Sequence, residues 1–193
     1  MTLREDAETI MQKAIRASLP DAAVAKALEH KEFGTGKIVV VAIGKAAWQM
    51  AKTAVGILDG RISAGIVITK YGHSKGELAP LEIWEAGHPV PDENSLKATQ
   101  RAIELVRDLT ERDTVLFLIS GGGSALFEKP LISLKELQDI TSDLLASGAD
   151  IVSTNTVRKR LSSVKGGKFA RLCAPAHVYA IVLSDIIGDP LDM

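Results

Sequence analysis

The sequence contains one cysteine, Cys173, in 193 residues, which excludes an internal disulfide bond. Its N-terminus is charged and lacks the apolar core of a signal peptide. It also lacks any apolar run near the roughly 18 residues that a transmembrane helix needs. We therefore expect a soluble, cytoplasmic protein with no membrane partner.

The sequence also lacks a strong net charge. Its formal charge is −1 at pH 7, whereas a nucleic-acid-binding domain is normally clearly basic, so we expect no nucleic-acid partner. Hydrophobic residues make up 46% of the chain and charged residues 24%, which is an ordinary globular composition. Because no repeat, low-complexity segment or linker divides the chain, we expect residues 1–193 to form one domain.

Runs of β-branched and apolar residues alternate with segments of helical periodicity. Capping boxes at Thr2–Glu5 and Ser133–Glu136 each predict the start of a helix. The expected strands are 37–43, 62–69, 81–85, 114–119 and 178–184, and the main helices between them are 46–58, 93–110, one that ends at Gly148 and one that Asp150 begins. This alternation predicts a three-layer α/β/α fold, doubly wound around a mainly parallel, Rossmann-like sheet.

The chain stops at Met193, just after its last expected strand, and no helix follows to cover that strand. An α/β fold rarely ends at a strand-to-loop exit, because its ligand sites lie there. We therefore expect a truncated piece of a longer protein.

Four features follow expected strands, where doubly wound sheets bind ligands. The first is Gly44 with Lys45, which comes directly after strand 37–43 and before a helix. Helix N–H groups and a lysine ammonium together suit phosphate. The pair is not part of a Walker A motif, because position 39, where that motif needs a glycine, is Val. A tight turn with a solvated lysine is the structural alternative.

The second feature is the run Ser120-Gly121-Gly122-Gly123-Ser124, which follows strand 114–119. Consecutive glycines indicate a backbone that another group approaches closely, and their N–H groups could hold phosphate or carboxylate. The run is not a dinucleotide fingerprint, whose third glycine would fall at Leu126. A flexible crossover loop is the alternative.

The third feature is the basic segment 155–171, which contains no acidic residue. Asn155 and Lys159 are about one helical turn apart, and Arg158 lies to one side of them. If the helix continues, Lys165 lies seven residues beyond Arg158, and Val164 joins the apolar face. These cations indicate an anion site, although a solvated helix face would also explain them.

The fourth feature is Asp185 with Asp189, after the last expected strand. Carboxylates beside phosphate-binding loops suit Mg²⁺, whereas turn and cap chemistry is the alternative. His73 and His88 are weaker candidates for catalysis. Together the four features favour phosphoryl transfer, which depends on positioning and charge neutralisation.

Several strings of the sequence resemble the class II glycerate kinases, a family that has also been labelled hydroxypyruvate reductase. They are VAIGKAA at 41–47, KYGH at 70–73, EAGHPVPD at 85–92, ISGGGSAL at 119–126, NTVRK at 155–159 with KGGK at 165–168, and LSDIIGDPLD at 183–192. The resemblance implies ATP-dependent phosphorylation of D-glycerate at its 2-hydroxyl, with Mg²⁺, to give 2-phosphoglycerate. It also implies a two-domain protein of which this chain is the N-terminal domain, and it is compatible with a homodimer.

The resemblance implies a role for each candidate residue. Lys45 would stabilise charge in the transition state, and Asp189, with Asp185 second, would bind the metal or orient the substrate hydroxyl. Arg158 would bind a carboxylate or phosphate. The other residues implied in substrate or phosphate binding are Gly44, Ser120, Gly121, Gly122, Gly123, Ser124, Asn155, Lys159 and Lys165. A reductase with a nicotinamide cofactor and a non-catalytic anion- or nucleotide-binding module stay open as alternatives, and no role follows for Glu128.

Overall fold

The computed structural model describes residues 2–184, which are built around a five-stranded sheet whose neighbouring strands are all parallel. The strands are β1 Ile38–Ile43, β2 Ile62–Lys70, β3 Leu81–Ala86, β4 Thr114–Ser120 and β5 His177–Leu183. Their order in the sheet is β3-β2-β1-β4-β5. The chain changes direction of winding between β1 and β4, so the sheet is doubly wound as predicted.

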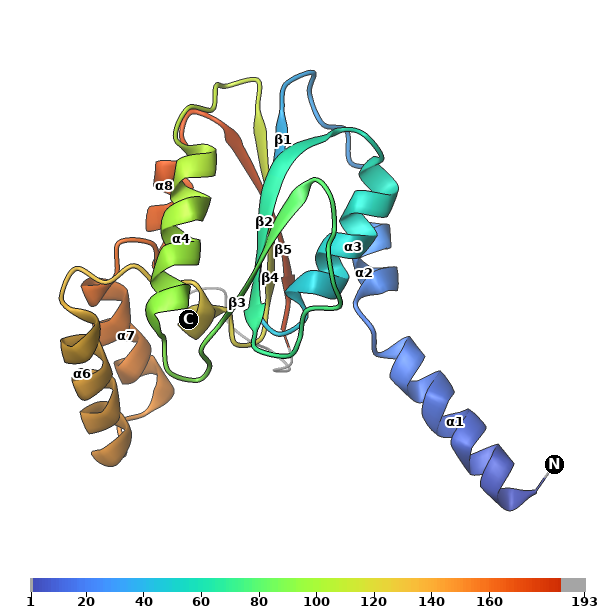
Figure 1. Ribbon diagram of the computed structural model, residues 1–193, viewed down its shortest axis with the longest axis horizontal. Coiled ribbons are helices and arrows are strands. Elements are labelled where there is room, and N and C mark those ends of the chain that lie inside the picture. Colours follow the sequence, from blue (N-terminus) through green and yellow to red (C-terminus); the bar gives the residue numbers. More distant parts are fainter. Residues whose placement is uncertain (1, 185–193) are drawn as a thin grey trace.

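Helices cover both faces of this sheet (Figure 1). Their bounds are α1 Leu3–Ala17, α2 Asp21–Leu28, α3 Ala47–Leu58, α4 Glu93–Val106, α5 Gly123–Leu126, α6 Leu134–Ala146, α7 Ile151–Leu161 and α8 Lys168–Leu172. α2 and α3 pack on one face, and α4 and α8 pack on the other. The predicted three-layer α/β/α class is therefore confirmed.

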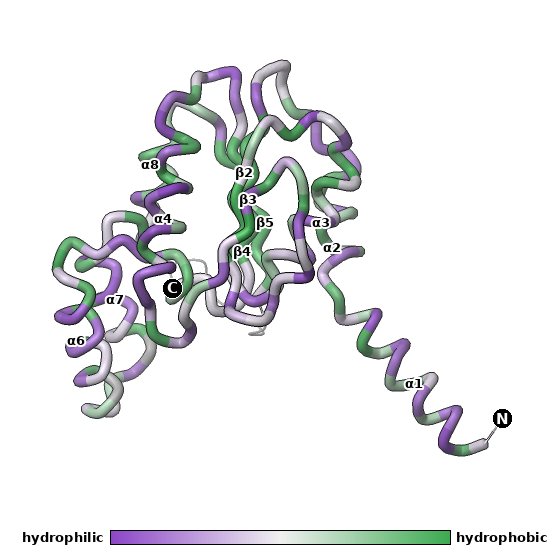
Figure 2. The backbone as a smooth tube through the Cα atoms, in the orientation of Figure 1, coloured by the Kyte–Doolittle hydropathy of each residue, from purple (hydrophilic) through white to green (hydrophobic). Residues whose placement is uncertain are grey.

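The side chains of β1 show why helices must pack on both faces of the sheet. All six of its residues are buried, because alternate side chains enter opposite layers. Val39 and Val41 belong to the core beneath α4, whereas Val40 and Ala42 belong to the core beneath α3. The hydropathy of the backbone shows the same arrangement, with hydrophobic strands at the centre and mixed helices around them (Figure 2).

Most predicted ends of strands and helices lie within two residues of the observed ones, but the helix predicted over 93–110 ends at Val106. The carboxylate of Asp113 accepts hydrogen bonds from the N–H of Thr110, at 2.6 Å, and from the N–H of Lys37, at 2.7 Å. These bonds hold a turn in front of β4, so the chain leaves the helix earlier than its apolar spacing suggests.

The first helix, α1, has the predicted capping box but lies apart from the sheet (Figure 1). None of its residues is buried, and Leu3, Ile10 and Ile15 are 90%, 69% and 59% exposed. Among residues 2–184 this apolar stripe therefore has no covering partner.

The turn after β1 is pressed against the end of β4. Gly44 has a φ of +110°, and a Cβ atom at this position would lie 2.3 Å from the Ser120 Oγ atom. The Gly44 N–H donates to the Ile68 carbonyl at 3.1 Å, and the Thr69 hydroxyl donates to the Gly44 carbonyl at 3.0 Å. A glycine here allows strands to approach one another, in addition to any role toward a ligand.

We expect Gly44→Ala to lower the free energy of unfolding more than Gly60→Ala does. Gly60 also has a positive φ, +68°, but its added Cβ would meet nothing within 4 Å. Gly60→Ala should therefore cost about 1 kcal/mol from backbone strain alone, whereas Gly44→Ala must also displace Ser120 and should cost about 3 kcal/mol or more. Urea denaturation followed by circular dichroism measures both, and equal losses would contradict the importance of the Ser120 contact.

Candidate functional site

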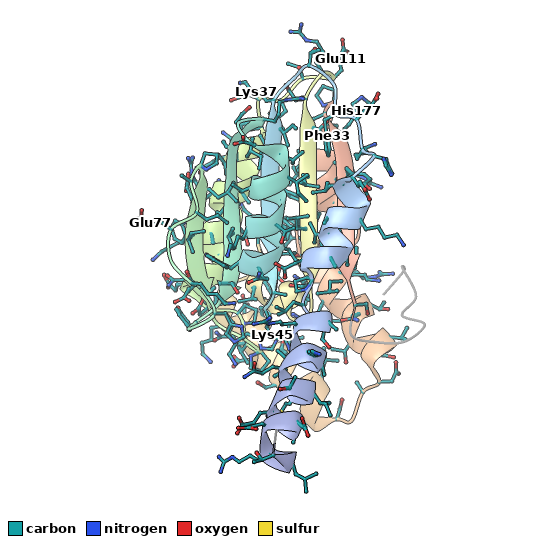
Figure 3. The ribbon with its side chains drawn as sticks, turned by 90° about the vertical axis from the view of Figure 1, so that its right-hand side faces the viewer. Phe33, Lys37, Lys45, Glu77, Glu111 and His177 are labelled. Carbon is teal, nitrogen blue, oxygen red and sulfur yellow. The ribbon has the colours of Figure 1, made fainter. Side chains whose placement is uncertain are left out.

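The loops after β1 and β4 meet at the carboxyl edge of the sheet. Lys45 lies at this edge, at the opposite end of the sheet from Lys37, Glu111 and His177 (Figure 3). The Lys45 N–H donates to the Gly121 carbonyl at 2.9 Å. The first two predicted features are therefore neighbours, as expected where the winding of a sheet reverses.

The Ser120 hydroxyl joins these two loops. It donates to the Ile43 carbonyl at 3.1 Å and accepts the N–H of Ala46 at 3.1 Å. Ser120 is also only 5% exposed, so its hydroxyl serves the scaffold. Its contribution to a ligand site is to place the glycines that follow it.

The glycine run leads into the short helix α5. Gly122 has a φ of +85°, which favours glycine, and α5 begins at Gly123. The N–H groups of Gly123 and Ser124 belong to the first turn of α5, so they have no acceptor within the helix. Backbone donors are thus available beside the Lys45 loop for an anion.

A cavity of about 390 Å³ opens between the glycine run and the basic segment. Its deep side is apolar, where Phe117, Phe127 and Phe169 form a tilted cluster with ring centroids 4.9–5.8 Å apart. Its polar lining consists of Ser120, Gly122, Gly123, Ser124, Asn155, Arg158, Lys159, Lys165, Gly166 and Gly167. The second and third predicted features therefore share one cavity, and the arrangement can bind an anion next to an apolar surface.

The basic segment starts as a helix and then turns away. The Asp150 carboxylate accepts the N–H of Ser153 at 2.9 Å and so begins α7, as predicted. The helix ends at Leu161, so it does not continue to Val164 and Lys165. Backbone hydrogen bonds to residues 129–131 stop it, including Leu131 N–H to the Leu161 carbonyl at 2.8 Å.

Two lysines after α7 bind backbone carbonyls. The Lys165 Nζ atom lies 2.6 Å from the Ser124 carbonyl and 2.9 Å from the Phe127 carbonyl. The Lys168 Nζ atom lies 2.9 Å from the Lys159 carbonyl and 2.6 Å from the Ser162 carbonyl, where it caps the end of α7. Both lysines thus stabilise the walls of the cavity.

Arg158 enters the cavity from α7. Its Nη2 atom donates to the Ser124 carbonyl at 3.3 Å, and its buried Nε atom has no hydrogen-bond partner among the described residues. Burial lowers the pKa of Arg158, and the nearby Glu128 carboxylate acts in the opposite direction. The guanidinium remains charged at neutral pH and presents an unpaired donor.

His88 is closer to the site than its sequence context suggested. A Cβ added to Gly122 would lie 2.8 Å from the His88 Nε2 atom and 3.5 Å from the Lys45 Cε atom, so both side chains border this glycine. His73 is also nearby, since its Nδ1 atom lies 3.2 Å from the Lys45 carbonyl. In the sequence, the only indication that these histidines lie near the site is that both follow expected strands.

The fourth predicted feature, Asp185 with Asp189, lies outside the described residues. Among residues 2–184 no group of three His, Cys, Asp or Glu side chains is placed to hold a metal ion. Across the same residues, no helix has both the length and the apolar character needed to cross a bilayer. The lining of the described cavity contains Arg158, Lys159 and Lys165 and no carboxylate.

Residues 6–193 match a family described as a domain of unknown function, DUF4147. This chain belongs to the DUF4147 family. The D-glycerate 2-kinase of Thermotoga maritima is 55% identical to it over 194 residues, which cover 100% of this chain and 46% of that protein. The glycerate 2-kinase of Pyrococcus horikoshii is 43% identical over 204 residues, with 100% and 46% coverage.

The crystal structure of Thermotoga maritima glycerate kinase has the same fold. It superimposes with a TM-score of 0.89 at 55% identity, covering 98% of this chain and 46% of that one. The resemblance inferred from the motif strings is therefore confirmed. This DUF4147 chain spans just under half the length of these relatives.

In this DUF4147 chain, we expect Lys45→Met to raise the pKa of His88 toward its ordinary value. The pKa of His88 is lowered first by burial and then by the positive charges of Lys45, Lys70 and His73. The variant leaves the burial unchanged, so the pKa should rise only in part. An NMR titration of the imidazole measures this shift, and Lys52→Met, on the exposed side of α3, is the control.

The lowered pKa of His88 also makes the free energy of unfolding depend on pH. The unfolded chain binds a proton at His88 more readily than the folded chain, so the free energy of unfolding should fall as the pH drops below about 6.5. A His88 pKa that is unchanged in Lys45→Met, or that moves equally in Lys52→Met, would contradict the placement of these side chains.

Proposed function

We propose that the whole gene product transfers the terminal phosphoryl group of ATP to the 2-hydroxyl of D-glycerate. The observation that carries this proposal is the 55% identity with a D-glycerate 2-kinase along the entire chain. The cavity at the carboxyl edge supports it independently, because it combines backbone donors with Arg158 and Lys159 beside an apolar surface. Positioning and charge neutralisation are what phosphoryl transfer requires of a protein.

The described residues suggest a division of roles. We propose that the run Gly121–Ser124 binds phosphate oxygens through backbone N–H groups, on a frame that Ser120 fixes and that the close approach at Gly44 allows. Arg158, with Asn155 and Lys159 beside it, would bind a second anionic group, either the glycerate carboxylate or a further phosphate. Lys45 would neutralise charge that develops on the transferring group.

The proposed metal ligands are Asp189 and Asp185. Mg²⁺ held by one or two carboxylates would neutralise phosphate charge when bound. Neither residue belongs to the described part of the chain, and the described part supplies cations rather than carboxylates at the cavity. We keep both assignments, the cytoplasmic location and a homodimer as predictions.

A nicotinamide-dependent reductase is less well supported. The dinucleotide fingerprint would need a glycine where Leu126 lies, and Leu126 is a fully buried core residue. Leu126 ends α5 and packs into the core beneath α4 instead of allowing close contact with a pyrophosphate.

The direct test uses the whole gene product with ATP, Mg²⁺ and D-glycerate. We expect a product that enolase consumes without any further enzyme, because enolase accepts 2-phosphoglycerate. A product that needs a mutase first would place the phosphate on the 3-hydroxyl. Turnover of hydroxypyruvate with NADH would favour the reductase, and ATP binding without turnover of any hydroxy acid would favour a binding module.

We expect Lys45→Met to lower kcat for glycerate phosphorylation by about 10²-fold or more, because loss of one group that stabilises transition-state charge costs that much. Lys52→Met, which removes a lysine charge from the exposed side of α3, should keep kcat within about twofold of the wild type. Steady-state kinetics and circular dichroism measure turnover and fold. Wild-type kcat in Lys45→Met would contradict the assignment.

A further inference from the structure

Glu128 is a fully buried carboxylate directly behind the cavity. It is 0% exposed, and its Oε2 atom lies 2.9 Å from the Lys165 Nζ atom. Apart from this ion pair, neither oxygen has a hydrogen-bond partner among the described residues. A buried carboxylate is costly unless it is paired, and the ion pair with Lys165 offsets that cost.

Backbone pairing brings the two partners together. Residues 129–131 run antiparallel to residues 161–163, with a bridge between Pro130 and Ser162. The Ser163 N–H and hydroxyl both donate to the Lys129 carbonyl, at 2.9 and 2.8 Å. Glu128 on one segment and Lys165 on the other therefore meet at the end of this pairing.

The Lys165 ammonium is fully engaged. Its three N–H groups have three close oxygens: the Ser124 carbonyl, the Phe127 carbonyl and the Glu128 carboxylate. Its side chain is only 12% exposed. Lys165 thus holds α5 against the chain after α7 through two carbonyl hydrogen bonds and the ion pair with Glu128.

The two cations Lys165 and Arg158 have different partners. Glu128 forms its ion pair with Lys165, whereas Arg158 lines the cavity and its buried Nε atom has no hydrogen-bond partner among the described residues. Glu128 is not among the residues that line the cavity. Its influence on a ligand must therefore pass through Lys165 and the backbone that Lys165 holds.

We propose that Glu128 is a positioning residue of the anion site: it keeps the Lys165 ammonium on the Ser124 and Phe127 carbonyls and so leaves Arg158 to bind the incoming anion. The inference deepens the proposed kinase function and rests on it for its kinetic readout. Its geometric part concerns the unliganded protein alone.

The electrostatics agree with this geometry. Burial is the main cause that lowers the pKa of Lys165, and Arg158 lowers it further. The charge and hydrogen bonding of Glu128 act against both. Without Glu128 the ammonium would lose its proton at lower pH, and the Ser124 and Phe127 carbonyls would lose a charged donor.

The first test is Glu128→Gln in the unliganded whole gene product. The pH at which Lys165 loses its proton should fall by about one unit or more, since a partner of opposite charge within 4 Å has been removed. NMR of side-chain ¹³Cε and ¹⁵Nζ labels measures it, and the Lys165 signal is the one that Lys165→Met lacks. Glu111→Gln removes a carboxylate from the opposite end of the sheet and should not move this titration (Figure 3).

The second test is the pH profile of kcat/KM for glycerate. In Glu128→Gln the alkaline loss of kcat/KM should begin at lower pH than in the wild type, and Glu128→Asp should restore part of the range. A merely structural role would reduce the amount of folded enzyme without moving the profile. An unmoved profile in folded Glu128→Gln would overturn the proposal.

A double variant covers the case in which Glu128→Gln does not fold. Lys165→Met leaves Glu128 unpaired, whereas Glu128→Met with Lys165→Met replaces the pair by apolar side chains and should regain stability. If Glu128 acts through Lys165, the second substitution should not lower kcat/KM below that of Lys165→Met. A further loss of tenfold would show an independent role and overturn the proposal.

The outcomes separate the two proposals. If Lys165 titrates as expected but no glycerate is phosphorylated, the kinase function fails and the positioning role stands for an anion site of another enzyme or module. If glycerate is phosphorylated but neither the titration nor the profile moves, the kinase function stands and the role of Glu128 fails.

Discussion

The Ser120 hydroxyl holds together the two loops on which the candidate site depends. It donates to the Ile43 carbonyl and accepts the N–H of Ala46, so the end of β4 and the turn into α3 cannot move apart. Gly44 makes this contact possible, because a Cβ would lie 2.3 Å from the hydroxyl oxygen. Lys45 and the glycine run are consequently neighbours before any ligand arrives, and that order lowers the entropic cost of binding.

Much of this arrangement could be predicted from the sequence because it depends on short-range signals. Buried β-branched runs such as 38–43, caps such as Asp150 and glycines at strand ends each have a local physical cause. Parallel topology then places all carboxyl ends at one edge, so the meeting of Lys45 with the glycine run follows from the fold class. The family resemblance added the substrate and the reaction, which spacing alone did not contain.

The roles of the individual cations could not be predicted, because they depend on contacts between distant segments. The apolar spacing is compatible with a helix that continues to Lys165, yet pairing with residues 129–131 ends α7 at Leu161. The basic segment therefore contains two kinds of cation. Arg158, Lys159 and Lys165 line the cavity, whereas Lys168 does not and instead donates to the Lys159 and Ser162 carbonyls at the end of α7. A charge count along the sequence treats all four alike.

A carboxylate behind an anion site would weaken anion binding if no cation lay between them, so the relative positions of Glu128 and Lys165 matter. Lys165 contacts Glu128 at 2.9 Å and also lines the cavity, whereas Glu128 does not. An anion in the cavity therefore meets the ammonium first, and the more distant carboxylate repels it less strongly. The carboxylate favours the charged form of the buried ammonium. The ammonium in turn donates to the Ser124 carbonyl, which Arg158 also contacts, and so helps to fix the position of that carbonyl. Stability of the cavity wall and affinity for an anion thus depend on the same ion pair.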